Sequence, residues 1–170
     1  SAYGGYVRER FEATGWFRTQ HDGRRWWLVD PEGNAFFSHG LCYGARLGEF
    51  GWYTDLEPFY QDAPSPEDPA FRPAFLRPSQ IPEYVKRYGL NERAEAWLIN
   101  PARVNMIRVF GEHWWEAWRV LSSRRFHDWG INTMGVGLVN YEDERLEDFL
   151  RLSKLPYAVT LKRFPVTGQA

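Results

Sequence analysis

The sequence WWLVDPEGNAFFSHGLCYG, residues 26–44, decides the predicted fold, because it reads as a strand, a tight turn and a second strand. In the turn, Pro31 presets φ near about −65°, and Gly33 and Asn34 tolerate the positive φ of a tight reversal. The residues before the turn are aromatic and β-branched, as in strands. The run 35–42 after it is mostly apolar and has strand length, which predicts a strand buried on both faces, as in a parallel sheet.

Upstream of this stretch the sequence predicts another hairpin. Residues 16–20 are strand-like, and Asp22-Gly23 is a strong turn signal before the chain returns through 25–29. Residues 16–42 therefore predict a three-stranded antiparallel meander. Residues 1–15 look like a polar lead-in anchored by Tyr6 and Phe11. We expect residues 1–34 to form one part of the chain, an N-terminal lead-in with β-hairpins, and residues 35–170 to form the other.

Regular patterning fades in the segment 44–100. Seven of the eleven prolines lie between Pro58 and Pro82, interspersed with aromatic residues. A disordered linker seldom carries so much apolar surface, so the composition favours an ordered loop, with short helices expected at 82–88 and 91–98. Loops this long in compact domains usually carry function.

Downstream, helices alternate with apolar strands. Pro101 begins a predicted helix over 101–110, and residues 112–129 place an apolar stripe on one face of a longer helix that Gly130 ends. Arg125 falls inside that stripe and would need a partner there. Strands at 131–137 and 157–161 flank a helix at 142–152. This order predicts an α/β fold with three parallel strands, counting 35–42. Such a sheet would leave an edge exposed after Leu161, so we expect further polypeptide, in the same chain or a second one, to complete it.

Two blocks of the chain resemble a known family. DGRRWWLVDPEGNAFFSHGL (22–41) resembles the hairpin that feeds the first barrel strand in agarase-like glycoside hydrolases of the (β/α)₈-barrel superfamily. FGEHWWEAWRVLSSRRFHDWGINTMG (110–135) resembles their next helix and second strand, and LPYAVTL (155–161) their third. The resemblance implies that residues 35–170 are the N-terminal part of a (β/α)₈ TIM barrel, its first three parallel strands, interrupted by the aromatic and proline-rich loop 44–100.

The resemblance also implies a function. These enzymes cleave a poly- or oligosaccharide with paired glutamates after their fourth and seventh strands, which this chain does not contain. The catalytic residues are therefore expected elsewhere, and Glu49, Asp55 and Glu57 are not nominated in their place. Functional groups of such a barrel lie at the carboxyl ends of its strands and in the loops that follow. The expected substrate-binding residues are His39, Tyr43, Arg46, Trp52, Tyr53 and Asn140.

Composition narrows the alternatives. The formal net charge of −1 disfavours nucleic acid as a partner, and no run approaches the roughly 18 apolar residues of a membrane span. Cys42 is the single cysteine, and neither a metal motif nor a signal-peptide pattern is present; no metal and no cofactor is expected, and the compartment stays open. Two other functions remain: a non-catalytic carbohydrate-binding module, and a small α/β domain that contacts a cofactor phosphate through Gly135 and Gly137.

Overall fold

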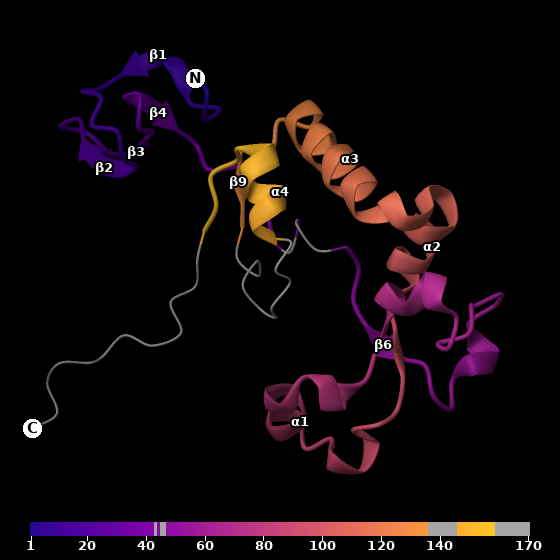
Figure 1. The fold of residues 1–170 in the computed structure, drawn as a ribbon. Coiled ribbons are helices and arrows are strands. Elements are labelled where there is room, and N and C mark those ends of the chain that lie inside the picture. The colour runs from indigo at the N-terminus through magenta and orange to yellow at the C-terminus, as the bar shows by residue number, and fades with distance from the viewer. Residues whose placement is uncertain (43, 45–46, 136–145, 159–170) are drawn as a thin grey trace, which may run out of the picture. The chain divides into compact units, whose positions relative to one another are not determined.

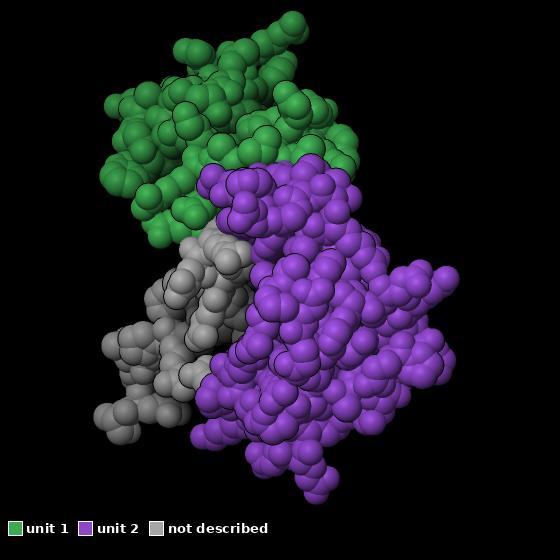
Figure 2. Space-filling model, turned by 45° about the vertical axis from the view of Figure 1, so that its right-hand side comes forward, with its two compact units in different colours: residues 1–45, 120–170 green, residues 46–119 purple. Residues whose placement is uncertain are grey.

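The computed structural model describes residues 1–42, 44, 47–135 and 146–158 (Figure 1). These residues form two compact units, coloured separately in Figure 2. Unit 1 consists of residues 1–45 and 120–170, and unit 2 of residues 46–119. The boundary falls within helix α3, Trp114–Asp128. The division predicted at residue 34 stays a prediction.

Unit 1 begins with a four-stranded antiparallel sheet. Its strands are β1 (Tyr6–Arg10), β2 (Arg18–His21), β3 (Trp26–Val29) and β4 (Asn34–Phe36), in the order β1-β4-β3-β2. The pairs β2–β3 and β3–β4 confirm the predicted meander. Strand β1 pairs with β4 and lies within residues 1–15, where we expected a polar lead-in and predicted no strand.

The two turns of this sheet are each organised by an aspartate. In the first, Asp22 accepts hydrogen bonds from the Trp27 Nε1–H at 2.7 Å and from the backbone N–H groups of Arg24 and Arg25. These bonds lower the pKa of Asp22 to about 2. In the second, Asp30 is fully buried and accepts from the Asn34 backbone N–H at 2.8 Å. In both turns the aspartate accepts from backbone N–H groups of the turn, and Asp30 also accepts from the Ser1 hydroxyl at 2.5 Å.

The predicted fold class, three parallel strands at the start of a TIM barrel, is wrong for the described residues. Their sheets are mostly antiparallel. Parallel pairing is limited to β5 (Gly40–Leu41) with β9 (Thr133–Met134), and to one bridge between Met134 and Tyr157. The predicted 35–42 strand is divided, because its first part, β4, belongs to the antiparallel sheet and only β5 pairs with β9.

A side chain explains why the run 35–42 is divided. The Asn132 amide donates to the Phe37 carbonyl at 2.9 Å, and its Oδ1 accepts from the His39 N–H at 2.8 Å. These backbone groups therefore bond to a side chain and not to a neighbouring strand. Phe37 itself is 81% exposed, so the apolar run is not buried throughout.

Two helices complete the described part of unit 1. Helix α3 confirms the predicted long helix, and Gly130 follows it with a positive φ of 69°. Helix α4, Leu146–Ser153, packs Phe149 against Phe126 of α3. The His127 ring lies 2.9 Å from the Ser153 carbonyl and adds a polar contact between the helices. Arg125 is exposed, so it needs no partner within the apolar stripe.

Unit 2 has its own antiparallel sheet. Strands β6 (Gly51–Trp52), β8 (Leu98–Ile99) and β7 (Phe75–Leu76) lie in the order β6-β8-β7. The expected helices at 82–88 and 101–110 are present as α1 (Pro82–Tyr88) and α2 (Pro101–Phe110). The remaining turns are short 3₁₀ helices: η1 (Glu57–Phe59), η2 (Pro69–Ala74), η3 (Pro78–Gln80), η4 (Asn91–Arg93) and η5 (Gly111–His113). The helix expected at 91–98 is wrong, because only the single turn η4 forms there and Leu98 belongs to β8.

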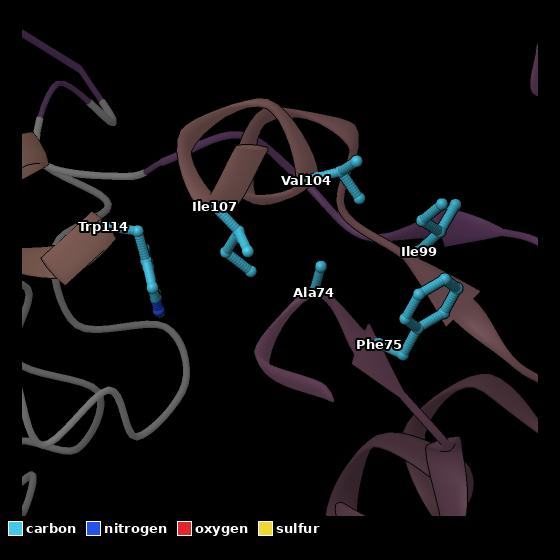
Figure 3. Packing of buried hydrophobic residues seen from close by; sticks show 6 residues of the cluster. All are labelled: Ala74, Phe75, Ile99, Val104, Ile107 and Trp114. Atoms are coloured by element: carbon cyan, nitrogen blue, oxygen red, sulfur yellow. The ribbon is translucent and has the colours of Figure 1, made fainter. Parts of the chain in front are cut away.

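The core of unit 2 lies between its sheet and helix α2. Figure 3 shows its buried side chains facing one another: Ala74, Phe75, Ile99, Val104, Ile107 and Trp114. Asn100 links the sheet to the helix, because its Oδ1 accepts from the Arg103 N–H at 3.0 Å and its amide donates to the Leu47 carbonyl at 2.8 Å. The proline-rich segment is thus ordered by burial of its aromatic and aliphatic residues.

Candidate functional site

Trp52 lies at an edge of the unit 2 sheet and is half-buried. Its backbone pairs with Leu98, and its carbonyl accepts from the Tyr60 hydroxyl at 2.9 Å. The Arg93 guanidinium lies 4.4 Å from the centroid of the indole ring. Arg93 is itself held by Asp55, with an N–O distance of 3.2 Å. An aromatic ring beside charged hydrogen-bonding groups can contact both the C–H surface and the hydroxyls of a sugar.

Tyr53 has a different environment, although it follows Trp52 directly. Consecutive residues of an extended chain point to opposite faces. The Tyr53 ring packs edge-to-face on Phe75, with centroids 5.3 Å apart, and lies 5.7 Å from the Tyr60 ring. Its backbone N–H donates to the Trp97 carbonyl at 2.9 Å. These contacts anchor the segment to the core, and a role of Tyr53 in binding stays a prediction.

His39 belongs to unit 1 and lies in the segment between β4 and β5. Its side chain is exposed, and its backbone N–H and carbonyl are both hydrogen-bonded to Asn132, at 2.8 and 3.0 Å. The fixed backbone leaves the imidazole able to donate to or accept from a ligand. The other three residues predicted to bind substrate, Tyr43, Arg46 and Asn140, lie outside the described residues. Of the three that are described, Trp52 and Tyr53 belong to unit 2 but have different surroundings, and His39 belongs to unit 1.

The carboxylates of the segment after β5 are poorly placed for acid–base catalysis. Glu49, Asp55 and Glu57 are all exposed, and Asp55 is committed to Arg93. A catalytic acid needs burial or a close like charge to keep its proton near neutral pH. Their exposure agrees with the expectation that none of the three is a catalytic residue.

A pocket over Trp97 was not predicted from the sequence. It has a volume of about 320 Å³ and contains charged side chains from three separate stretches, among them Arg72, Arg77 and Glu95. The Arg77 guanidinium lies 4.1 Å from the Trp97 ring centroid and 3.1 Å from the Glu95 carboxylate. Each residue alone is an ordinary charged loop residue. The pairing of β7 with β8 brings these stretches together, which no local pattern signals.

The described residues contain neither a cluster of metal-ligating side chains nor a membrane-spanning helix. Within residues 1–42, 44, 47–135 and 146–158, no group of three or more His, Cys, Asp or Glu side chains could hold a metal ion. Among the same residues, no helix is both long and apolar enough to cross a membrane.

Comparison with known proteins gives a consistent result. No family model matches the chain. Its sequence is 28% identical over 149 residues to beta-agarase B of Vibrio sp. (strain JT0107), a match that covers 79% of this chain and 16% of that protein. The chain thus spans about a sixth of the length of this curated relative.

Three solved structures share the fold. The agarase AgWH50C matches with a TM-score of 0.65 and 23% identity, over 92% of this chain and 22% of that one. PfGH50B matches with a TM-score of 0.61 and 18% identity, over 92% and 24%. An exo-beta-agarase matches with a TM-score of 0.59 and 16% identity, over 92% and 25%. In sequence and in fold, the chain is therefore similar to a part of agarase-like glycoside hydrolases.

Proposed function

We propose that this chain is part of a glycoside hydrolase that cleaves a poly- or oligosaccharide, of the agarase or galactanase type. The observation that carries this proposal is the similarity to beta-agarase B, which extends over 79% of the chain. The shared fold with three further structures, two of them described as agarases, supports it. The carbohydrate is the partner that this similarity implies.

The catalytic pair lies, in this proposal, in polypeptide beyond these 170 residues. A retaining glycosidase needs two carboxyl groups about 5–5.5 Å apart, one as nucleophile and one as acid and base. The exposed carboxylates Glu49, Asp55 and Glu57 provide no such protected pair. The contribution of the present chain is to contact the sugar, through His39, Trp52 and the other residues expected to bind substrate.

The test is hydrolysis by the full-length protein. Purified protein is incubated with agarose, with a sulfated galactan and with xylan, and newly formed reducing ends are measured over time. We expect release from the neutral galactan agarose and none from xylan. Trp52→Ala should raise KM for agarose with little change in kcat, because it removes a contact made equally in the ground and transition states. Trp52→Phe, which keeps an aromatic ring, should restore most of the affinity.

Two outcomes would contradict the proposal. If agarose binds but no reducing ends appear from either galactan, the alternative of a non-catalytic carbohydrate-binding module is favoured. If Trp52→Ala behaves as the wild type, Trp52 has no part in substrate binding, and the contact with sugar must be assigned to other residues.

A further inference from the structure

The pocket over Trp97 is built from ordered parts of unit 2. Arg72 belongs to η2, Arg77 follows β7, and Ser79 belongs to η3. The Ser79 backbone N–H donates to the Ala94 carbonyl at 2.8 Å, which holds η3 against the stretch that leads to Trp97. The walls of the pocket are therefore fixed by backbone hydrogen bonds before any ligand arrives.

The charged side chains of the pocket are oriented by one another and by the indole ring. The Arg77 guanidinium lies against the Trp97 ring and pairs with Glu95, while that of Arg72 lies 5.8 Å from the same ring centroid. Hydrogen bonds from the Ser79 hydroxyl and from Arg77 lower the pKa of Glu95. The Glu95 carboxylate thus stays ionised at neutral pH and acts as a hydrogen-bond acceptor.

The charged side chains of the pocket indicate which class of ligand it can bind. The pocket holds two guanidinium groups, Arg72 and Arg77, and two carboxylates, Glu67 and Glu95. Their charges cancel, so neither a polyanion nor a polycation is favoured over a neutral molecule. Arginine donors, the two carboxylates and the Ser79 hydroxyl lie around the Trp97 indole, whose ring already carries the Arg77 guanidinium at 4.1 Å. Such a group of donors and acceptors suits a ligand with many hydroxyl groups. A pocket of about 320 Å³ lies near the small end of the range for ligand sites, about 300–1,000 Å³.

We propose that the pocket lined by Glu67, Arg72, Arg77, Ser79, Glu95 and Trp97 binds a neutral sugar unit of a polysaccharide chain. Glu67 and Arg72 are exposed, so a polymer can reach these two lining residues from solvent. The identity of the polymer as a galactan rests on the proposed function, whereas the preference for an uncharged sugar rests on the pocket alone.

Affinity electrophoresis tests this site directly. Full-length protein is run in cold native polyacrylamide gels that contain low-melting agarose, and separately in gels that contain κ-carrageenan, a sulfated galactan. We expect agarose to retard the wild type more strongly than κ-carrageenan does. Arg72→Gln and Glu67→Gln each remove a charged hydrogen-bonding group from the exposed rim. Each should raise the dissociation constant for agarose about five- to tenfold.

Matched controls separate the pocket from general charge effects. Arg87→Gln and Glu92→Gln make the same chemical changes in unit 2 but outside the pocket, and they should migrate as the wild type does. Melting temperatures check the fold of every variant. If Arg72→Gln lowers the melting temperature, Glu67→Gln, at another exposed residue of the pocket, decides the test.

The proposal is overturned if both pocket variants are retarded as strongly as the wild type, or if κ-carrageenan binds more strongly and Arg72→Gln abolishes that binding. The experiments distinguish failure of this pocket proposal from failure of the proposed function. Agarose hydrolysis with unchanged retardation of the variants contradicts the pocket alone. Retardation that depends on Arg72 and Glu67, without release of reducing ends, contradicts the hydrolase alone.

Discussion

Replacing Phe149 with alanine should destabilise unit 1 by about 3–5 kcal/mol, the usual cost of removing a buried aromatic ring. Phe149 is completely buried, and its ring packs edge-to-face on Phe126 with centroids 6.1 Å apart. This ring contact holds α4 against α3 together with the polar contact between the His127 ring and the Ser153 carbonyl. The lost stability has two parts. The free energy gained by burying the ring away from water is lost, and a cavity is left between the two helices.

Hydrogen exchange with denaturant measures this effect in each unit separately. Amides of residues 120–135 and 146–158 should lose protection, while those of α2 should keep theirs. Leu152→Ala is the control, because Leu152 lies on the same helix but is 42% exposed, so its change should fall within about 0.5 kcal/mol. Equal effects of Phe149→Ala and Leu152→Ala would mean that α4 is not held by its buried ring.

Asp30→Ala should be the second strongly destabilising change. The carboxylate is fully buried and accepts from the Ser1 hydroxyl at 2.5 Å and from the Asn34 backbone and amide N–H groups at 2.8 and 3.1 Å. Asn34 is itself completely buried, so its donors would lose their acceptor without gaining water. Each buried donor left unpaired costs about 1–3 kcal/mol.

The same residue predicts how stability depends on pH. Burial raises the pKa of Asp30, but the hydrogen bonds from Ser1 and Asn34 outweigh it, and the pKa lies below its ordinary value of 3.8. The folded state then binds fewer protons than the unfolded state. The stabilisation is fully present above about pH 3.8 and is lost as the pH falls through the lower pKa of the folded state.

The free energy of unfolding, measured by denaturant titration at a series of pH values from neutral to acid, checks both the cost of Asp30→Ala and the pH dependence. Wild-type stability should fall below about pH 4 more steeply than that of Asp30→Ala, which lacks the titrating group. Glu9→Gln, at an exposed position of β1, is the control and should follow the wild-type curve. Parallel curves for the wild type and Asp30→Ala would show that Asp30 does not couple protonation to folding.

Local signals in the sequence predicted the local structure well. The Asp22-Gly23 and Gly33-Asn34 turns, the start of α2 at Pro101 and the end of α3 before Gly130 all depend on the backbone preferences of single residues. These preferences act over a few residues and are visible in any sequence window. The meander and the main helices could therefore be placed before the structure was known.

The long-range arrangement could not be predicted in the same way. Whether 35–42 is one strand or two depends on Asn132, whose amide reaches Phe37 and His39 from more than ninety residues away. The apolar character of residues 35–42 alone predicted a single strand, which is wrong. The pocket over Trp97 has the same origin, because Arg77 and Glu95 meet through the pairing of β7 with β8. Trp52 lies beside Arg93 whereas Tyr53 packs on Phe75, a difference that the sequence pattern did not signal, and a role of either residue in binding substrate stays a prediction.

We propose that this chain is part of a galactan hydrolase whose catalytic carboxylates lie elsewhere in the protein. The most direct measurement is kcat for release of reducing ends from agarose by the full-length protein, compared with that of its Glu49→Gln/Asp55→Asn/Glu57→Gln variant. We predict that both proteins hydrolyse agarose with similar kcat values. A loss of about 10²–10⁴-fold in the variant, as expected when a general acid or base is removed, would place the chemistry within this chain, and no release by the wild type would contradict the hydrolase itself.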